Sequence, residues 1–157
     1  MALRNVVKAP DDVLRKKSKP VERFDAKLAS LLDDMAETMY KTQGVGIAAP
    51  QVGILRRVVF IDIGEGPIEL VNPEITEQKG NQRGIEGCLS CPNQWGYVDR
   101  PMNVIVKAKD RNGNDVEYKC SEYFARCVCH ELDHLDGQLF IDIADEMVDQ
   151  SEIEDEN

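Results

Sequence analysis

The spacing of apolar residues predicts a long α-helix in the first third of the chain. Between residues 26 and 41, apolar side chains recur with a period of about 3.6, which places them on one helical face. Asp25 directly precedes this segment, and its carboxylate can accept hydrogen bonds from the first free N–H groups of a helix. We expect this helix to pack on the core through Leu28, Leu31, Leu32, Met35 and Met39.

A second amphipathic segment follows near the C-terminal end, from about residue 121 to residue 137. Ser121 can cap the start of this helix, and Gly137 can end it. A shorter helix is expected after the turn residues 10–12. The apolar positions of the C-terminal segment recur at helical spacing and are Phe124, Val128, Leu132 and Leu135.

The middle of the chain has the composition of β-strands. Residues 57–63 and 68–71 are rich in β-branched residues and are separated by a turn with two glycines and a proline. Residues 103–109 and 115–119 flank the sequence Arg-Asn-Gly-Asn, which is typical of an antiparallel hairpin. Strands grouped between helices indicate an α+β domain rather than a parallel βαβ fold.

Length, charge and cysteine content narrow the class of protein. A chain of 157 residues with 42% hydrophobic residues predicts one globular domain, here residues 1–144. The rest, residues 145–157, is acidic and is expected to be a solvated tail, with seven acidic and no basic residues between 145 and 156. The net charge of -10 argues against direct binding of nucleic acid. Without an apolar signal segment or membrane span, the chain is expected in the cytoplasm, with its five cysteines reduced.

The C-terminal helix carries a candidate metal site in the sequence His-Glu-Leu-Asp-His. His130 and His134 are four residues apart, so both imidazoles project from one helical face and can bind one ion. Glu131 follows the first histidine and is placed to exchange a proton with a metal-bound water. These are the two histidines of the chain, and both lie in this motif.

Two further segments offer groups that such a site needs. A catalytic metal with protein ligands usually has three of them and keeps a position for water. Cys88, in a glycine-containing loop, is the leading candidate for the third ligand, although a small buried cysteine is the ordinary alternative. Residues 44–51 are small and glycine-rich, so this backbone can approach a ligand closely. Gln51 ends this segment and can donate a hydrogen bond from its amide.

These three stretches together resemble the motifs of the bacterial peptide deformylases. Residues 44–51, 86–90 and 130–134 match the family's motifs in order, and the resemblance covers about residues 3–143. It implies antiparallel sheets packed around the metal-binding helix, with helices near the N-terminus. It also implies removal of the formyl group from the N-terminal formylmethionine of nascent polypeptides, near the ribosome, with release of formate.

The resemblance further implies a role for each matching residue. A metal-bound water or hydroxide attacks the formyl carbon, and Glu131 acts as general acid and base. The implied metal ligands are Cys88, His130 and His134, and the implied donors to the oxyanion are Gln51 and the backbone N–H of Leu89. Fe(II) is implied in the cell, and zinc, nickel and cobalt suit the same ligands. The implied substrate-binding residues are Val45, Gly46, Gly87, Tyr123, Arg126 and Cys127.

The chain also departs from the family pattern at several positions. Cys129 stands where the family commonly has glutamine, and Trp95 stands where a basic residue is common. Tyr123 and Arg126 stand where the substrate pocket is often aliphatic. The acidic tail replaces a long basic C-terminal helix. We expect these changes to affect the preference for the substrate side chain rather than the class of reaction.

Two other functions remain open at this point. A zinc endopeptidase shares the His-Glu-x-x-His pattern but usually recruits a downstream ligand, and only the acidic tail follows here. A structural zinc module could use Cys88, Cys91 and both histidines, although 38 residues separate Cys91 from His130. Around the metal, Asp133 could orient a ligand histidine and Arg100 could pair with Glu86, or both could simply face solvent.

Overall fold

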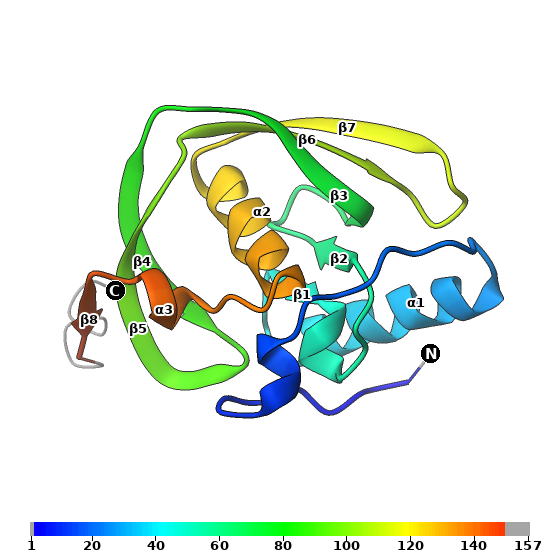
Figure 1. The fold of residues 1–157 in the computed structure, drawn as a ribbon, viewed down its shortest axis with the longest axis horizontal. Coiled ribbons are helices and arrows are strands. Elements are labelled where there is room, and N and C mark those ends of the chain that lie inside the picture. The colour runs from blue at the N-terminus through cyan, green and yellow to red at the C-terminus, as the bar shows by residue number, and fades with distance from the viewer. Residues whose placement is uncertain (1, 150–157) are drawn as a thin grey trace.

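Two antiparallel sheets and a central helix dominate this computed structural model, which describes residues 2–149. The larger sheet has the order β1-β2-β3-β6-β7, and the smaller one has the order β4-β5-β8. Helix α2 runs through the middle of the molecule, with β4 and β5 beside it (Figure 1). The helical elements are η1 (Asp12–Arg15), α1 (Ala26–Lys41), η2 (Ala49–Val52), α2 (Glu122–Leu135) and α3 (Phe140–Ile143). The strands are β1 (Gly46–Ala48), β2 (Val58–Ile61), β3 (Ile68–Lys79), β4 (Gln82–Cys88), β5 (Cys91–Arg100), β6 (Asn103–Lys109), β7 (Asp115–Ser121) and β8 (Glu146–Val148).

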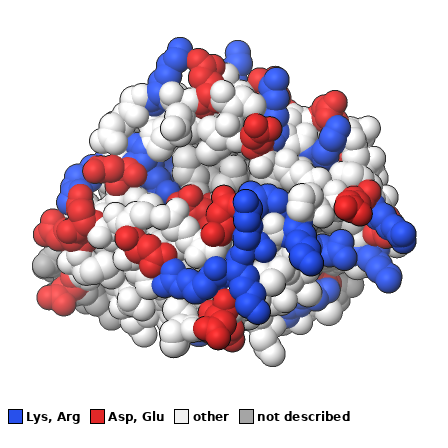
Figure 2. Space-filling model, in the orientation of Figure 1, with Lys and Arg blue, Asp and Glu red and all other residues white. Residues whose placement is uncertain are grey.

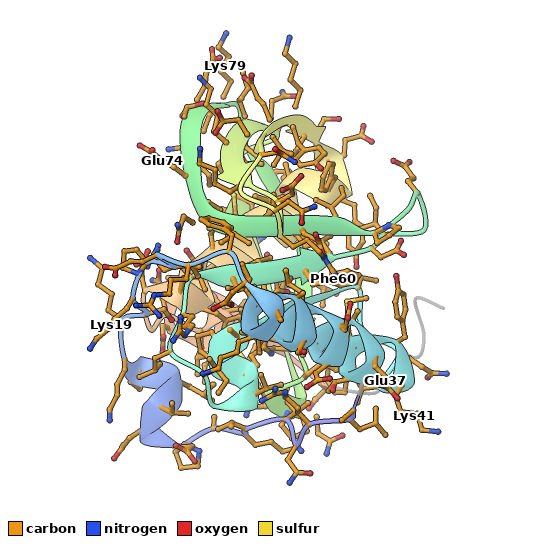
Figure 3. All side chains as sticks on the ribbon, turned by 90° about the vertical axis from the view of Figure 1, so that its right-hand side faces the viewer. Lys19, Glu37, Lys41, Phe60, Glu74 and Lys79 are labelled. Atoms are coloured by element: carbon orange, nitrogen blue, oxygen red, sulfur yellow. The ribbon has the colours of Figure 1, made fainter. Side chains whose placement is uncertain are left out.

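Strand β2 separates the two long helices. Val58 and Phe60 pack in the same cluster as the apolar face of α1. Val59 and Ile61 pack with the apolar face of α2. Successive side chains point to opposite faces of a strand, so this uninterrupted apolar run buries both faces of β2. Figure 3 shows Phe60 between β2 and α1, whereas Lys79 lies at the far end of β3. The sheet therefore fixes α2, which carries Glu131 and the two predicted histidine ligands.

The two long helices lie where they were predicted, and the predicted N-terminal capping bond is present in α1. Helix α1 covers the predicted residues, and Asp25 Oδ1 accepts a hydrogen bond from Leu28 N at 3.1 Å. Helix α2 begins directly after Ser121, but the Ser121 side chain forms no capping hydrogen bond, so that predicted cap is wrong. Helix α2 ends two residues before Gly137, whose φ of 76° is the left-handed conformation that lets the chain turn away.

The strands agree with prediction where the apolar pattern is strong. The hairpin of β6 and β7 is confirmed, with Asn103 opposite Ser121 at one end and Lys109 opposite Asp115 at the other. Strand β3 is much longer than the predicted residues 68–71. The prediction missed its second half because that half is polar and largely exposed. The hairpin of β4 and β5 was not predicted, since its buried positions are interrupted by charged residues and glycines.

Part of the predicted acidic tail is folded. Strand β8 pairs with β5, with Val148 opposite Trp95, and Val148 is buried. Arg83 donates a hydrogen bond to Asp145 at 2.5 Å. The prediction of a solvated tail therefore fails at strand β8, which pairs with β5 and buries Val148, although the side chains of residues 145–147 are exposed as predicted. Residues 150–157 lie outside the described part.

Charge is unevenly distributed on the surface. Lys and Arg side chains gather in the middle and on the right of the face shown in Figure 2, whereas acidic side chains are frequent on the left. A hollow of about 980 Å³ lies elsewhere than the predicted site and includes Lys19, Arg23, Lys27 and Arg56 in its lining. Within residues 2–149, no helix has both the length and the apolar character needed to cross a membrane.

Candidate metal-binding active site

Helix α2 and the β4–β5 hairpin bring the three predicted metal ligands together. His130 and His134 lie one turn apart on α2, and Cys88 is the last residue of β4. One ligand atom from each lies within 4.8 Å of the others, and Cys88 Sγ is 3.3 Å from His134 Nε2. Among residues 2–149, this is the group of His, Cys, Asp and Glu with metal-binding spacing, and Cys91 is not part of it. A thiolate with two imidazoles is a donor set for a divalent transition metal.

A cleft of about 360 Å³ opens onto these side chains. Every residue predicted for the site lines this cleft except His134, which is fully buried behind it. The lining also includes Glu86 and Trp95, which the sequence analysis named for other reasons, and three residues to which it gave no role, Gln43, Gly44 and Ile85. Each of these three is adjacent to a predicted motif or belongs to one, so chain proximity was the available signal.

Glu86 holds one ligand histidine in place from behind. Glu86 Oε1 is 2.8 Å from His130 Nδ1, which leaves Nε2 as the ring atom for a metal. Arg100 donates two hydrogen bonds of 2.9 Å to the same carboxylate, as the sequence analysis suggested. Arg126 adds a third donor at 2.7 Å. Burial by itself would raise the pKa of Glu86, but Arg100 and His130 hold it well below its usual range.

Asp133 does not orient a ligand histidine, so that suggestion is wrong. Its carboxylate instead accepts a hydrogen bond of 2.6 Å from Arg100 Nη1. The motif places Asp133 one residue before His134, and successive helical residues point in different directions. Asp133 therefore supports the site indirectly, through Arg100 and Glu86.

Glu131 has the opposite environment to Glu86. It is buried, its Oε1 has no hydrogen-bond partner among the described residues, and burial raises its pKa to about 7. The strand β1 passes directly over it, because a Cβ atom on Gly46 would lie 2.6 Å from Glu131 Oε2. The absence of a side chain at Gly46 thus allows the carboxylate to reach the cleft.

The two histidines differ in how readily they take a proton. Burial lowers the pKa of His134 well below its usual value, and its Nδ1 has no partner within residues 2–149. Burial also opposes protonation of His130, but hydrogen bonding to Glu86 and the nearby Glu131 outweigh it and raise the pKa of His130. A bound cation would favour the neutral form of both rings, since only that form offers a lone pair.

Gln51 is held rigidly beside Cys88 by the short helix η2. Its Oε1 accepts a hydrogen bond of 2.9 Å from Ala48 N, which fixes the orientation of the amide. Its Nε2 lies 3.2 Å from Ser90 Oγ and 3.5 Å from Cys88 Sγ. Leu89 lies in the turn of the β4–β5 hairpin and also lines the cleft. Both predicted oxyanion donors therefore border the same space as the metal-binding group.

The edge of the larger sheet borders the cleft. Strand β1 pairs with β2 on one side and is the last strand of its sheet, so its other edge is open. Gly46 begins this strand, Val45 directly precedes it, and both residues line the cleft. An open edge presents N–H and C=O groups that can pair with an extended peptide.

The departures at Arg126 and Tyr123 have different structural consequences. Arg126 is buried, and its Nη1 also donates to Val98 O at 3.0 Å. A Cβ on Gly84 would lie 2.9 Å from Arg126 Nη2, so the glycine makes room for the guanidinium. Tyr123 is 53% exposed at the rim of the cleft. The charge of Arg126 is thus directed toward Glu86, while Tyr123 remains available to a ligand.

The departures at Cys129 and Trp95 are also explained by packing. Cys129 is buried in the cluster that joins α2 to the larger sheet and forms no hydrogen bond with the described residues. Trp95 covers the hairpin, since a Cβ on Gly87 would lie 2.9 Å from its indole ring. Gly87 therefore permits this ring to form one wall of the cleft.

Comparison with known proteins finds relatives along nearly the whole chain. The family model described as polypeptide deformylase matches residues 3–150. A peptide deformylase of Caldicellulosiruptor bescii is 57% identical over 154 residues, which are 98% of this chain and 93% of the relative. One of Acetivibrio thermocellus is 52% identical over 154 residues, 98% of this chain and 91% of the relative.

Solved structures give the same result for the fold. A peptide deformylase of Thermotoga maritima matches with a TM-score of 0.90 and 41% identity, over 92% of this chain and 99% of that one. One of Legionella pneumophila matches with a TM-score of 0.89 and 45% identity, over 90% of this chain and 86% of that one. The predicted α+β fold is therefore confirmed.

Proposed function

The chain belongs to the peptide deformylase family, a family of metal-dependent enzymes, and from this premise we propose how its cleft removes the N-terminal formyl group from nascent polypeptides. The observation that carries the proposal is the meeting of a three-residue metal-binding group with a buried carboxylate whose Oε1 has no partner within residues 2–149. A structural zinc module would give that carboxylate no task. The activity accounts for both features.

The residues around the site fit a divalent metal. Cys88, His130 and His134 would hold it, and the Glu86 carboxylate would keep the His130 ring oriented. His134 Nε2 faces Cys88, so each histidine presents the same kind of ring nitrogen. When bound, such an ion acts as a Lewis acid on a carbonyl oxygen and lowers the pKa of water. The ligands suit iron, zinc, nickel and cobalt, and we propose Fe(II) in the cell.

Glu131 is the proposed proton carrier. Its pKa near 7 lets it exist in both protonation states close to neutral pH. Its carboxylate takes a proton from the water that attacks the formyl carbon. It then gives that proton to the nitrogen of the departing amine, because an amine leaves poorly as an anion. The products are formate and a polypeptide with a free N-terminal methionine.

Gln51 and Leu89 are the proposed donors to the oxygen that becomes negative during attack. Gln51 Nε2 is already directed toward Cys88 and Ser90, so it needs no large movement to reach a substrate in the cleft. The backbone N–H of Leu89 would act from the turn on the same side. One such donor typically contributes about 3–4 kcal/mol to stabilising the transition state.

The substrate is proposed to bind as an added strand. Its backbone would pair with the open edge of β1 at Val45 and Gly46, which places the formyl group over Glu131. The methionine side chain would enter the cleft beside Gly87, Tyr123, Arg126 and Cys127. Nascent chains emerging from the ribosome in the cytoplasm are the proposed source of this substrate.

The test is formate release from formyl-Met-Ala-Ser, with the metal content of each sample measured after gel filtration. The wild-type chain should hold one metal ion and release formate. Cys88→Ser should lose both properties, because a neutral hydroxyl replaces a thiolate ligand. Cys91→Ser is the matched control and should keep the metal and most of the activity. Equal loss of metal from both variants would instead favour the structural zinc module.

A further inference from the structure

We propose that Cys91 is a resolving cysteine, which forms a reversible disulfide with Cys88 when that metal-binding residue is oxidised by a hydroperoxide. The two residues end β4 and begin β5, and they are register partners across the two-residue turn of this hairpin. Register partners on antiparallel strands project to the same side of the sheet, with Cα atoms about 4.5–5.5 Å apart. Disulfides need a Cα separation of about 4.4–6.8 Å, and the usual separation of register partners falls within this range.

Contacts of the two thiols agree with this register. Cys88 packs against the apolar cluster that contains Cys91. Both cysteines are free thiols. The pair therefore has the proximity that disulfide formation needs.

The two cysteines differ in their access to the cleft. Cys88 lines it, so a small peroxide that enters the cleft meets this sulfur first. Cys91 is 1% exposed and lies behind Cys88, among Leu14, Val98, Leu139 and Phe140. An accessible cysteine with a second cysteine buried directly behind it is the usual arrangement of an oxidation-sensitive cysteine and its resolving cysteine.

The chemistry balances with a hydroperoxide as the oxidant. The Cys88 thiolate attacks the O–O bond, gains one oxygen as a sulfenic acid, and releases water or an alcohol after protonation. The Cys91 sulfur then attacks the Cys88 sulfur, so an S–S bond forms and the S–O bond breaks. Hydroxide leaves with the Cys91 proton as water. Two thiols have together given two electrons to the peroxide, and an external thiol can reverse the step by exchange.

The proposed disulfide removes a metal ligand but protects it from permanent loss. Without a resolving thiol, a sulfenic acid proceeds to sulfinic and sulfonic acids, which ordinary thiols do not reduce. The alternative is that Cys91 only fills the apolar cluster. In that case Cys91→Ala would change packing but not the end product at Cys88.

The test treats the zinc-loaded full chain with hydrogen peroxide, because zinc itself undergoes no redox change. After alkylation, trypsin should release residues 84–107, which contain both cysteines, because trypsin does not cleave between Arg100 and Pro101. For the wild-type chain we expect this peptide to be unalkylated and two hydrogen atoms lighter than its reduced form. Oxidation should also release zinc, and dithiothreitol should restore zinc binding. Cys91→Ala should instead accumulate sulfinic or sulfonic acid at Cys88 and should not recover.

A second cysteine in the cleft provides the control. Cys127→Ala removes the other thiol that lines it and should leave the Cys88–Cys91 product unchanged. Over-oxidised Cys88 beside alkylated Cys91 in the wild-type chain would overturn the proposal, as would a Cys88–Cys127 disulfide. Equal recovery of wild type and Cys91→Ala would do the same. The readouts are mass and bound zinc, so they stand apart from the proposed deformylase activity.

Discussion

The two buried glutamates of the site, Glu86 and Glu131, are equally shielded from water but have opposite electrostatic surroundings. Both are 5% exposed. Arg100, Arg126 and His130 surround the carboxylate of Glu86, and its pKa lies well below the usual range. Glu131 has an oxygen without a partner among the described residues, and burial raises its pKa to about 7.

The difference between these two residues separates structure from chemistry in the site. A carboxylate with a complete set of donors stays ionised and fixes its neighbours, whereas one without donors can gain and lose a proton near neutral pH. Burial alone therefore does not identify the proton carrier. The hydrogen-bond partners separate the two residues: Glu86 orients His130, and Glu131 is the proposed proton carrier.

The largest expected effect comes from removing the proton carrier. Glu131→Ala should keep its metal, because Glu131 is not a proposed ligand, but should lower formate release by a factor of about 10²–10⁴. Formate release and metal content measured on the same sample test this prediction. Glu131→Gln is the matched control for shape and should be impaired in the same way. Near-normal turnover in a metal-loaded sample of either variant would disprove the assignment.

Removing the orienting carboxylate should mainly reduce stability and metal affinity. Glu86→Gln leaves Arg100 and Arg126 without their shared counter-charge, and breaking a buried ion pair on one side typically costs about 3–5 kcal/mol. Loss of a group that orients a ligand histidine should weaken metal binding by a factor of about 10–100. Urea unfolding and competition with a chelator measure the two effects.

A more exposed ion pair provides the control for this substitution. Glu69 pairs with Arg111, whose side chain is 31% exposed, so Glu69→Gln should cost no more than about 1 kcal/mol. If Glu86→Gln were as mild as Glu69→Gln, the network behind His130 would not hold the site together.

A smaller effect is expected where β1 crosses Glu131. In Gly46→Ala the new methyl group would lie 2.6 Å from Glu131 Oε2, so the carboxylate or the strand must move. Such overpacking typically costs about 1–3 kcal/mol. The cost should shrink when Gly46→Ala is combined with Glu131→Ala, because the clashing group is then absent. A double-mutant cycle of unfolding free energies tests this coupling, and strictly additive costs would contradict it.

The sequence predicted the parts of this molecule in which one segment carries its own signal. The periodic apolar face of α1, the turn between β6 and β7, and the two histidines one turn apart were all readable locally. Cys88 could be paired with the histidines because they needed a third ligand. The family resemblance then supplied the order of the three motifs.

Features that depend on contacts between distant segments were not readable in this way. The bond between Glu86 and His130 joins residues 44 apart, and only the packing of the β4–β5 hairpin against α2 brings them together. The role of Gly46 depends on the position of Glu131, and the residues next to Gly46 in the sequence do not specify that position. The anchoring of β8 was missed because the acidic residues in and around this strand outweigh one buried valine in composition.

A further expected effect is the pH dependence of the stability of the metal-free chain. Burial raises the pKa of Glu131 from its ordinary value of 4.5 to about 7 in the folded chain. Below about pH 4.5 the residue is protonated in the folded and unfolded states alike, and its full contribution to stability is present. As the pH rises toward 7, the unfolded chain releases this proton while the folded chain retains it, so the contribution is lost.

Glu131→Gln carries no such proton. The unfolding free energy of each protein is measured with urea in the presence of a chelator. The value for Glu131→Gln minus that for the wild type should therefore increase between about pH 4.5 and pH 7 and stay constant above pH 7. A bound cation favours the ionised carboxylate, so saturation with zinc should reduce the difference. Parallel curves below pH 7 in the metal-free proteins would mean that Glu131 finds partners for its charge, and the contrast with Glu86 would fail.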